Sequence, residues 1–143
     1  MMDLRPLDET TFAAPMLEQS DMDALARDGV TTVICNRPDA EVPPSHQAAA
    51  MQAAVEAAGM TFVFNPIAGS TLTVDAVEEQ ADAIDGADGK VVAYCASGTR
   101  SAILWALARA GQMETDDILA ETARAGYSLD GLRGQIDQLA AQA

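Results

Sequence analysis

Residues 91–111 read VVAYCASGTRSAILWALARAG and join a predicted strand, a short loop and a helix. The first five residues are mostly apolar and rich in valine, which is typical of a buried strand. Four small residues follow Cys95, and an apolar helix is predicted over residues 100–110, with Gly111 as its natural stop. A strand that passes through a tight loop into a helix is half of a βαβ unit, so this stretch predicts an α/β fold.

The rest of the chain repeats this alternation of strand and helix. Residues 30–35 (VTTVIC) and 61–65 (TFVFN) are predicted to be strands. Residues 4–14 have an ambiguous pattern that a small hairpin at the edge of the sheet would also fit. Helices are predicted over residues 20–28, 45–58, 73–84, 115–125 and 129–141, the first three capped by Ser20, Ser45 and Thr73. Strands separated by helices imply crossover connections. We therefore expect a small, mostly parallel sheet flanked by helices.

Composition limits the classes of function. The chain has 143 residues, a net charge of −14 and 49% hydrophobic residues. Its acidity opposes binding to nucleic acid or to an anionic membrane. Two cysteines and one histidine are too few for a four-ligand zinc site or a disulfide framework, so no metal or cofactor is expected. With no apolar leader or membrane-length apolar run, we expect one cytoplasmic domain over residues 1–143, with C-terminal helices over about 114–143.

The loop after Cys95 carries the most informative chemistry. Ala96, Ser97, Gly98 and Thr99 are small, so their backbone N–H groups can curl inward and bind an anion at a helix N-terminus. Such a field would favour the thiolate of Cys95 and make it nucleophilic. Arg100 adds a planar fork for oxyanions, and Ser101 could donate to the thiolate or to a leaving sulfur. The simpler alternative is a buried cysteine followed by an ordinary surface arginine.

The end of the first long strand supplies further candidates, because ligands bind beyond the carboxyl ends of parallel strands. Arg37 could add a second positive charge, or it could be a turn residue that pairs with Asp39 or Glu41. Cys35 could be a resolving thiol for Cys95, or a small core residue. The only histidine, His46, could assist proton transfer, or it could be a solvated helix residue.

Several of these segments resemble known families. Residues 94–111 resemble the active-site loop and following helix of rhodanese-type sulfurtransferases. The chain as a whole resembles the phosphatase-like domain of beta-lactamase-hydrolase-like proteins, a family also described as bacterial sulfur transferases. The matching landmarks lie between residues 3 and 110: residues 4–7 (LRPL), 36–39 (NRPD), 65–67 (NPI) with Gly69, and the Cys95 loop. The resemblance implies a fold similar to protein tyrosine phosphatases, with Cys95 as nucleophile, Arg100 as oxyanion binder, and Arg37 and Asp39 near the site mouth.

Two departures from the tyrosine phosphatase pattern bear on the reaction. Four residues, not five, separate Cys95 from Arg100, which is the rhodanese spacing and makes a narrower ring of N–H groups. Residues 68–70 hold no carboxylate where a phosphatase keeps its general acid, leaving only Asp39 or Asp75 to serve. Sulfur transfer needs no such acid, because sulfite or a thiolate leaves unaided.

These arguments give one leading hypothesis and two alternatives. The leading hypothesis is a sulfurtransferase in which Cys95 takes sulfur from a small-molecule donor as a persulfide and passes it to a thiol acceptor. The first alternative is a phosphatase acting through a Cys95 phosphoenzyme. The second is a non-catalytic module that senses an oxyanion or thiol oxidation. The apolar stripe of the last helix could serve a homodimer or the domain's own core.

Overall fold

The computed structural model describes residues 2–68 and 72–142 and contains one five-stranded sheet in the order β1-β2-β5-β3-β4. The strands are β1 (Arg5–Pro6), β2 (Thr11–Ala14), β3 (Val30–Cys35), β4 (Thr61–Phe64) and β5 (Lys90–Tyr94). β1 pairs antiparallel with β2, and every other pairing in the sheet is parallel. The expected fold class is confirmed, and the edge hairpin that the sequence allowed over residues 4–14 is present. The hairpin extends the sheet, because β2 also pairs with β5.

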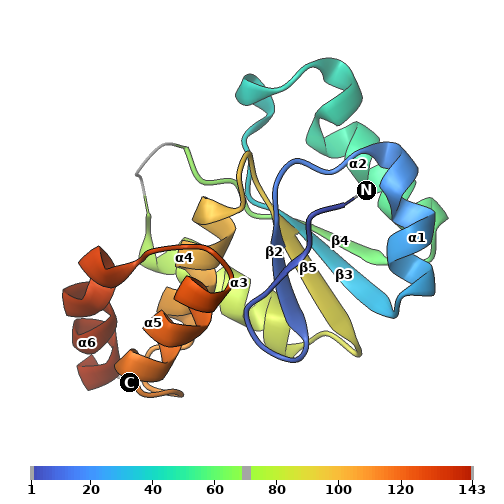
Figure 1. Ribbon diagram of the computed structural model, residues 1–143. Coiled ribbons are helices and arrows are strands. Elements are labelled where there is room, and N and C mark those ends of the chain that lie inside the picture. Colours follow the sequence, from blue (N-terminus) through green and yellow to red (C-terminus); the bar gives the residue numbers. More distant parts are fainter. Residues whose placement is uncertain (1, 69–71, 143) are drawn as a thin grey trace.

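Helices cover both faces of this sheet. They are α1 (Met22–Arg27), α2 (Ala48–Ala57), α3 (Val74–Asp85), α4 (Thr99–Ala108), α5 (Thr115–Arg124) and α6 (Arg133–Gln142). Figure 1 shows α1 and α2 on one side and the other four helices on the opposite side. The parallel pairing brings the carboxyl ends of β2, β3, β4 and β5 to one edge of the sheet. Any site built from the following loops must lie at that edge.

Two of the three predicted helix caps are wrong. Thr73 does cap α3, because its hydroxyl accepts the Ala76 N–H at 3.1 Å. Ser45 instead lies inside a 3-10 turn, and the Asp39 carboxylate accepts the Ala48 N–H at the start of α2 at 2.7 Å. Ser20 also lies inside a 3-10 turn, which begins after Glu18. Both differences arise because 3-10 turns precede the α-helices, a local tightening that periodicity does not reveal.

Each face of the sheet has its own apolar core. Met22, Leu25 and Met51 pack with Tyr94 beneath α1 and α2. On the other face, Trp105 is fully buried beneath the remaining helices. The apolar stripe predicted over residues 129–141 joins this second core: Leu129 and Ile136 are buried in it, and Leu132 and Leu139 pack against it. The helix α6 itself begins only at Arg133, after a 3-10 turn over Asp130–Leu132. Of the described helices, none is long and apolar enough to cross a membrane.

Candidate active site

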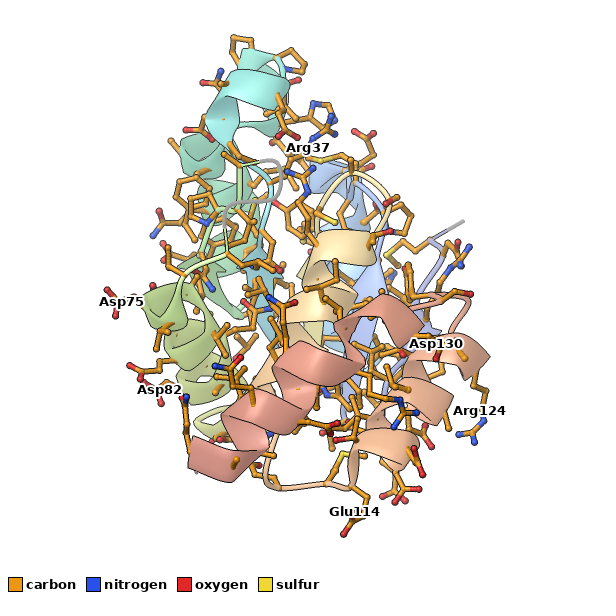
Figure 2. The ribbon with its side chains drawn as sticks, turned by 90° about the vertical axis from the view of Figure 1, so that its left-hand side faces the viewer. Arg37, Asp75, Asp82, Glu114, Arg124 and Asp130 are labelled. Carbon is orange, nitrogen blue, oxygen red and sulfur yellow. The ribbon has the colours of Figure 1, made fainter. Side chains whose placement is uncertain are left out.

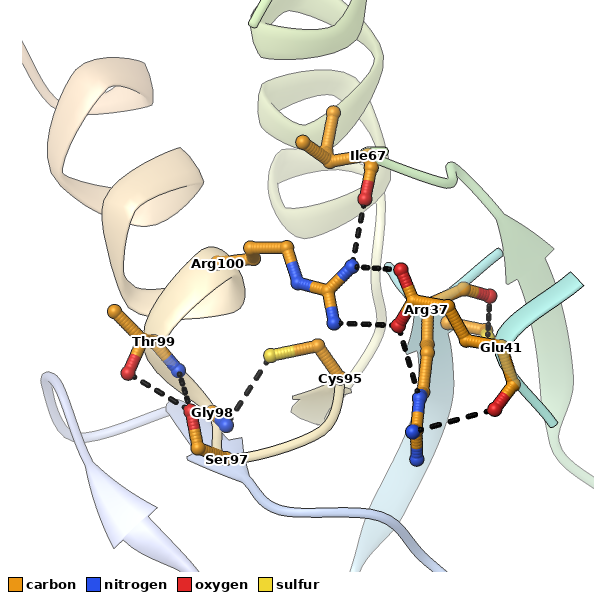
Figure 3. Close-up of polar contacts among 9 residues, drawn as sticks. Arg37, Glu41, Ile67, Cys95, Ser97, Gly98, Thr99 and Arg100 are labelled. Carbon is orange, nitrogen blue, oxygen red and sulfur yellow. Dashed lines mark hydrogen bonds and ion pairs between the residues drawn. The ribbon is translucent and has the colours of Figure 1, made fainter. Parts of the chain in front are cut away.

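Cys95 begins the loop between β5 and α4 and lies at the sheet edge where the strands end. Its side chain is buried, and Sγ accepts a hydrogen bond from the Gly98 N–H at 3.1 Å (Figure 3). Gly98 has a φ of +95° and is the N-cap of α4, a backbone conformation that favours glycine. The loop can therefore fold back toward the cysteine and aim an amide of the helix N-terminus at sulfur.

Two carbonyl groups of the loop bind partners outside the loop. Ala96 O accepts the Met16 N–H at 3.3 Å, and Ser97 O accepts the Tyr127 hydroxyl at 3.2 Å. The C=O and N–H of a trans peptide point in opposite directions. The N–H groups of Ser97 and Gly98, which belong to these two peptides, therefore point away from Met16 and Tyr127. In these two peptides the backbone is arranged as in an anion-binding nest, while the Thr99 N–H donates to the Ser97 hydroxyl at 3.4 Å.

Arg100 and Arg37 share one carboxylate, that of Glu41. Arg100 donates from Nη2 and Nη1 to the two Glu41 oxygens at 2.8 and 2.9 Å, and Nη1 also donates to Ile67 O at 2.8 Å. Arg37 Nε donates to Glu41 Oε1 at 3.1 Å. Two guanidinium groups and one carboxylate give this cluster a net charge of +1 while Cys95 is a thiol, in a chain whose overall charge is −14. An oxyanion can therefore be attracted locally.

The bidentate pair fixes the orientation of Arg100. The hydrogen bonds with Glu41 raise the pKa of Arg100, although partial burial opposes the rise, and the nearby Cys95 raises it further. The same bonds lower the pKa of Glu41. Glu41 uses the edge formed by Nη1 and Nη2, so the edge that includes Nε is left for a substrate. Figure 3 shows Cys95 lying beside this guanidinium.

Sequence reasoning did not assign Glu41 a part in the site. Glu41 entered only as one of two possible partners for Arg37, and that pair is present. The contact with Arg100 spans 59 residues and depends on how the loop after β3 folds over the loop after β5. No local pattern carries that information, and the only available signal was the neighbouring position of the two strand ends.

We expect Glu41→Gln to make the protein less stable at neutral pH, by up to about 1 kcal/mol because the pair is partly solvent-screened. The lowered pKa of Glu41 means that its contribution is present above the usual glutamate range and is lost as pH falls through the folded-state value. Urea unfolding of both proteins from pH 7 to pH 3 would measure the difference. Glu121→Gln, which breaks an exposed pair with Arg124, is the matched control. A wild-type advantage that stays constant over this range would contradict the expectation.

A network of buried amide side chains joins the strand ends next to the site. Asn36 donates to Asn65 O at 2.8 Å and to Gln80 Oε1 at 2.9 Å, which ties the ends of β3 and β4 to α3. The Ser101 hydroxyl donates to Asn36 Oδ1 at 2.8 Å and so joins α4 to the same network. Ser101 is fully buried, and its proton is directed to Asn36 rather than to Cys95. Buried amides with this many partners hold one arrangement of the strand ends.

Asp39, Asp75 and His46 make their contacts away from Cys95 and Arg100. The Asp39 carboxylate lies at the start of α2, where it accepts the Ala48 N–H. Figure 2 shows the exposed Asp75 pointing outward from α3, away from Arg37. His46 lies between Ser45 and the Glu18 carboxylate, at 2.7 and 2.6 Å.

Cys35 is a free thiol, as is Cys95. It packs in the core beneath α1 and α2, and burial raises its pKa. Thr99 shares a hydrogen bond with Ser97 through their hydroxyls at 2.9 Å. Gly69, one of the landmark residues, lies outside the described residues.

Comparison with known proteins adds to this geometry. Residues 3–112 match the model of the family described as beta-lactamase hydrolase-like protein, phosphatase-like domain. A beta-lactamase hydrolase-like protein of Xylella fastidiosa is 35% identical over 106 residues, which cover 73% of this chain and 25% of that protein. The chain thus spans about a quarter of the length of the curated relatives it matches.

Solved structures agree on the fold. A protein from Neisseria meningitidis, provisionally named a phosphatase, superposes with a TM-score of 0.81 at 34% identity and covers 97% of this chain and 99% of its own. The structure of Tk-PTP in its active form gives a TM-score of 0.79 at 20% identity, with 99% of this chain and 98% of its own covered. At 20% identity, the match with Tk-PTP shows a shared fold and nothing more. Together the comparisons favour the phosphatase-like alternative over the sulfurtransferase expectation.

Proposed function

This chain belongs to the family of phosphatase-like domains of beta-lactamase hydrolase-like proteins, and we propose that it is a cysteine-based hydrolase of phosphate monoesters. Cys95 is the nucleophile, the loop N–H groups and Arg100 bind the oxyanion, and Arg37 adds charge at the mouth. The observation that carries the proposal is the Gly98 N–H donated to Cys95 Sγ beside the Arg100 guanidinium.

The reaction has two steps. In the first, the Cys95 thiolate attacks phosphorus, the bond between phosphorus and the ester oxygen breaks, and the alkoxide or phenoxide leaves with the bonding pair and takes a proton from water. In the second, water attacks the phosphocysteine, which releases inorganic phosphate and returns the thiolate. Charge on the transferring oxygens is stabilised by donors already oriented by Glu41 and by the loop.

The carboxylates near the site bear on the substrate class. Glu41 is held ionised by two arginines, because the hydrogen bonds from Arg100 and Arg37 lower its pKa. Asp39 is engaged with the Ala48 N–H of α2, and Asp75 points outward. A leaving group would therefore depart without strong help from a proton donor. This favours phosphate esters whose leaving group is a stable anion, such as an acidic phenol.

Sulfur transfer is a second candidate, favoured by the four-residue spacing between Cys95 and Arg100 and by the same shortage of acids. Here the Cys95 thiolate attacks the sulfane sulfur of thiosulfate, the S–S bond breaks and sulfite leaves. An acceptor thiolate then attacks the outer sulfur of the Cys95 persulfide, which gives an acceptor persulfide and restores Cys95. The thiosulfate oxyanion would use the same loop and arginine.

A series of aryl phosphates with phenols of increasing pKa tests the proposal. We expect kcat/KM to fall by at least about tenfold from the most to the least acidic phenol, because the departing oxygen carries charge. A flat dependence would contradict the inferred lack of a proton donor. No hydrolysis of any ester, together with sulfite release from thiosulfate, would reject the phosphatase in favour of the second candidate.

A further inference from the structure

We infer that Tyr127 is a positioning residue that aims the Gly98 N–H at Cys95. Tyr127 lies between α5 and α6, beyond the residues that match the family model, and sequence reasoning gave it no role. The inference deepens the proposed function and rests on it for the importance of the Cys95 thiolate. The orientation of the peptide itself is a property that can be measured without turnover.

One peptide unit connects the tyrosine to the cysteine. The Tyr127 hydroxyl donates to Ser97 O at 3.2 Å, and the N–H of the same peptide, that of Gly98, donates to Cys95 Sγ at 3.1 Å. Because this unit is planar and trans, its two polar groups point in opposite directions. A donor that holds the carbonyl outward therefore holds the N–H inward, toward sulfur.

Tyr127 is itself held in place. Arg5 in β1 lies 5.4 Å from the centre of the Tyr127 ring, and its Nη1 donates to Ala125 O at 3.3 Å. The Tyr127 side chain is mostly buried, and burial raises the pKa of its hydroxyl. The phenol accordingly keeps the proton that it donates to Ser97.

Close packing at Gly98 makes the contact specific. A Cβ on Gly98 would overlap the Tyr127 hydroxyl and come within 3.3 Å of the Ala14 carbonyl carbon. The hydroxyl therefore lies against the backbone of the loop, in a space that no side chain at Gly98 could share. Tyr127 thus supports the loop at Gly98, whose N–H donates to the sulfur.

Tyr127→Phe removes the hydroxyl and keeps the ring against Arg5. We expect Cys95 alkylation by iodoacetamide to slow by about threefold to tenfold at pH 7, the range for loss of one hydrogen bond. The midpoint of the alkylation rate against pH should move to higher pH, while the plateau at high pH stays as in wild type. Mass mapping of the Cys95 peptide separates this signal from Cys35.

Two further measurements make the outcome decisive. Thermal unfolding reports whether Tyr127→Phe stays folded, and Arg5→Lys, which loosens the same turn, should give a smaller shift in the same direction. An alkylation curve in Tyr127→Phe that coincides with wild type would overturn the inference, even if turnover fell. A shifted curve in a protein that hydrolyses no phosphate ester would keep the inference and reject the proposed function.

Discussion

Cys95→Ser should lower the hydrolysis of a reactive aryl phosphate by at least about a thousandfold, because loss of a covalent nucleophile has effects of this order or larger. A serine hydroxyl is far less ionised than a thiol near neutral pH. The Gly98 N–H would then face a neutral oxygen in place of a thiolate. The loop and Arg100 would remain, so oxyanion binding should survive. Initial rates and phosphate inhibition constants for both proteins measure the two effects separately.

Cys35→Ala is the matched control for this experiment. It removes the other cysteine, which is buried in the core on the α1 and α2 side and whose pKa is raised by burial. We expect turnover within a few-fold of wild type and a small loss of stability. Turnover that survives in Cys95→Ser, or that disappears in Cys35→Ala while the protein remains folded, would show that the wrong thiol has been assigned.

The second large effect is expected for Arg100→Lys, with a fall in kcat of about 100-fold or more. A lysine keeps the charge but loses the planar fork, so it cannot bind the Glu41 carboxylate through two nitrogens while presenting another edge to a substrate. In the native protein, Arg100 makes three hydrogen bonds that fix its orientation. Steady-state kinetics with one aryl phosphate gives kcat and KM for the variant.

Arg37→Lys is the matched comparison, since this arginine contacts the same carboxylate but lies only four residues before it, in the loop after β3. We expect it to raise KM by several-fold and to change kcat less than Arg100→Lys does. Equal losses of kcat in both variants would mean that the two arginines act as one unit. An unchanged kcat in Arg100→Lys would contradict the assigned role in transition-state stabilisation.

The fold and the centre of the site could be predicted because their signals are local. The valine-rich run before Cys95, the small residues after it and the apolar helix that follows are contiguous. Burial of a strand, freedom of a glycine at positive φ and helix periodicity act over a few residues each. The position of Cys95 at the sheet edge then follows from the parallel order of the strands.

The residues that orient this centre could not be predicted in the same way. Glu41 reaches Arg100 across 59 residues, and Tyr127 reaches Ser97 across 30. Asp39, one of the two candidate proton donors, accepts the Ala48 N–H at the start of α2, a contact across nine residues. Such contacts depend on how loops close over the sheet edge, and neither composition nor spacing encodes that closure.

The central claim, a covalent intermediate on Cys95, is tested most directly by intact mass. Wild type and Cys95→Ser would be mixed with an aryl phosphate, and separately with thiosulfate, and quenched in denaturant within the first turnover. We predict a gain of about 80 Da with the phosphate in wild type alone, mapped to the Cys95 peptide; a gain of about 32 Da with thiosulfate would identify the sulfur reaction. No adduct with either compound, or the same adduct in Cys95→Ser, would contradict the claim.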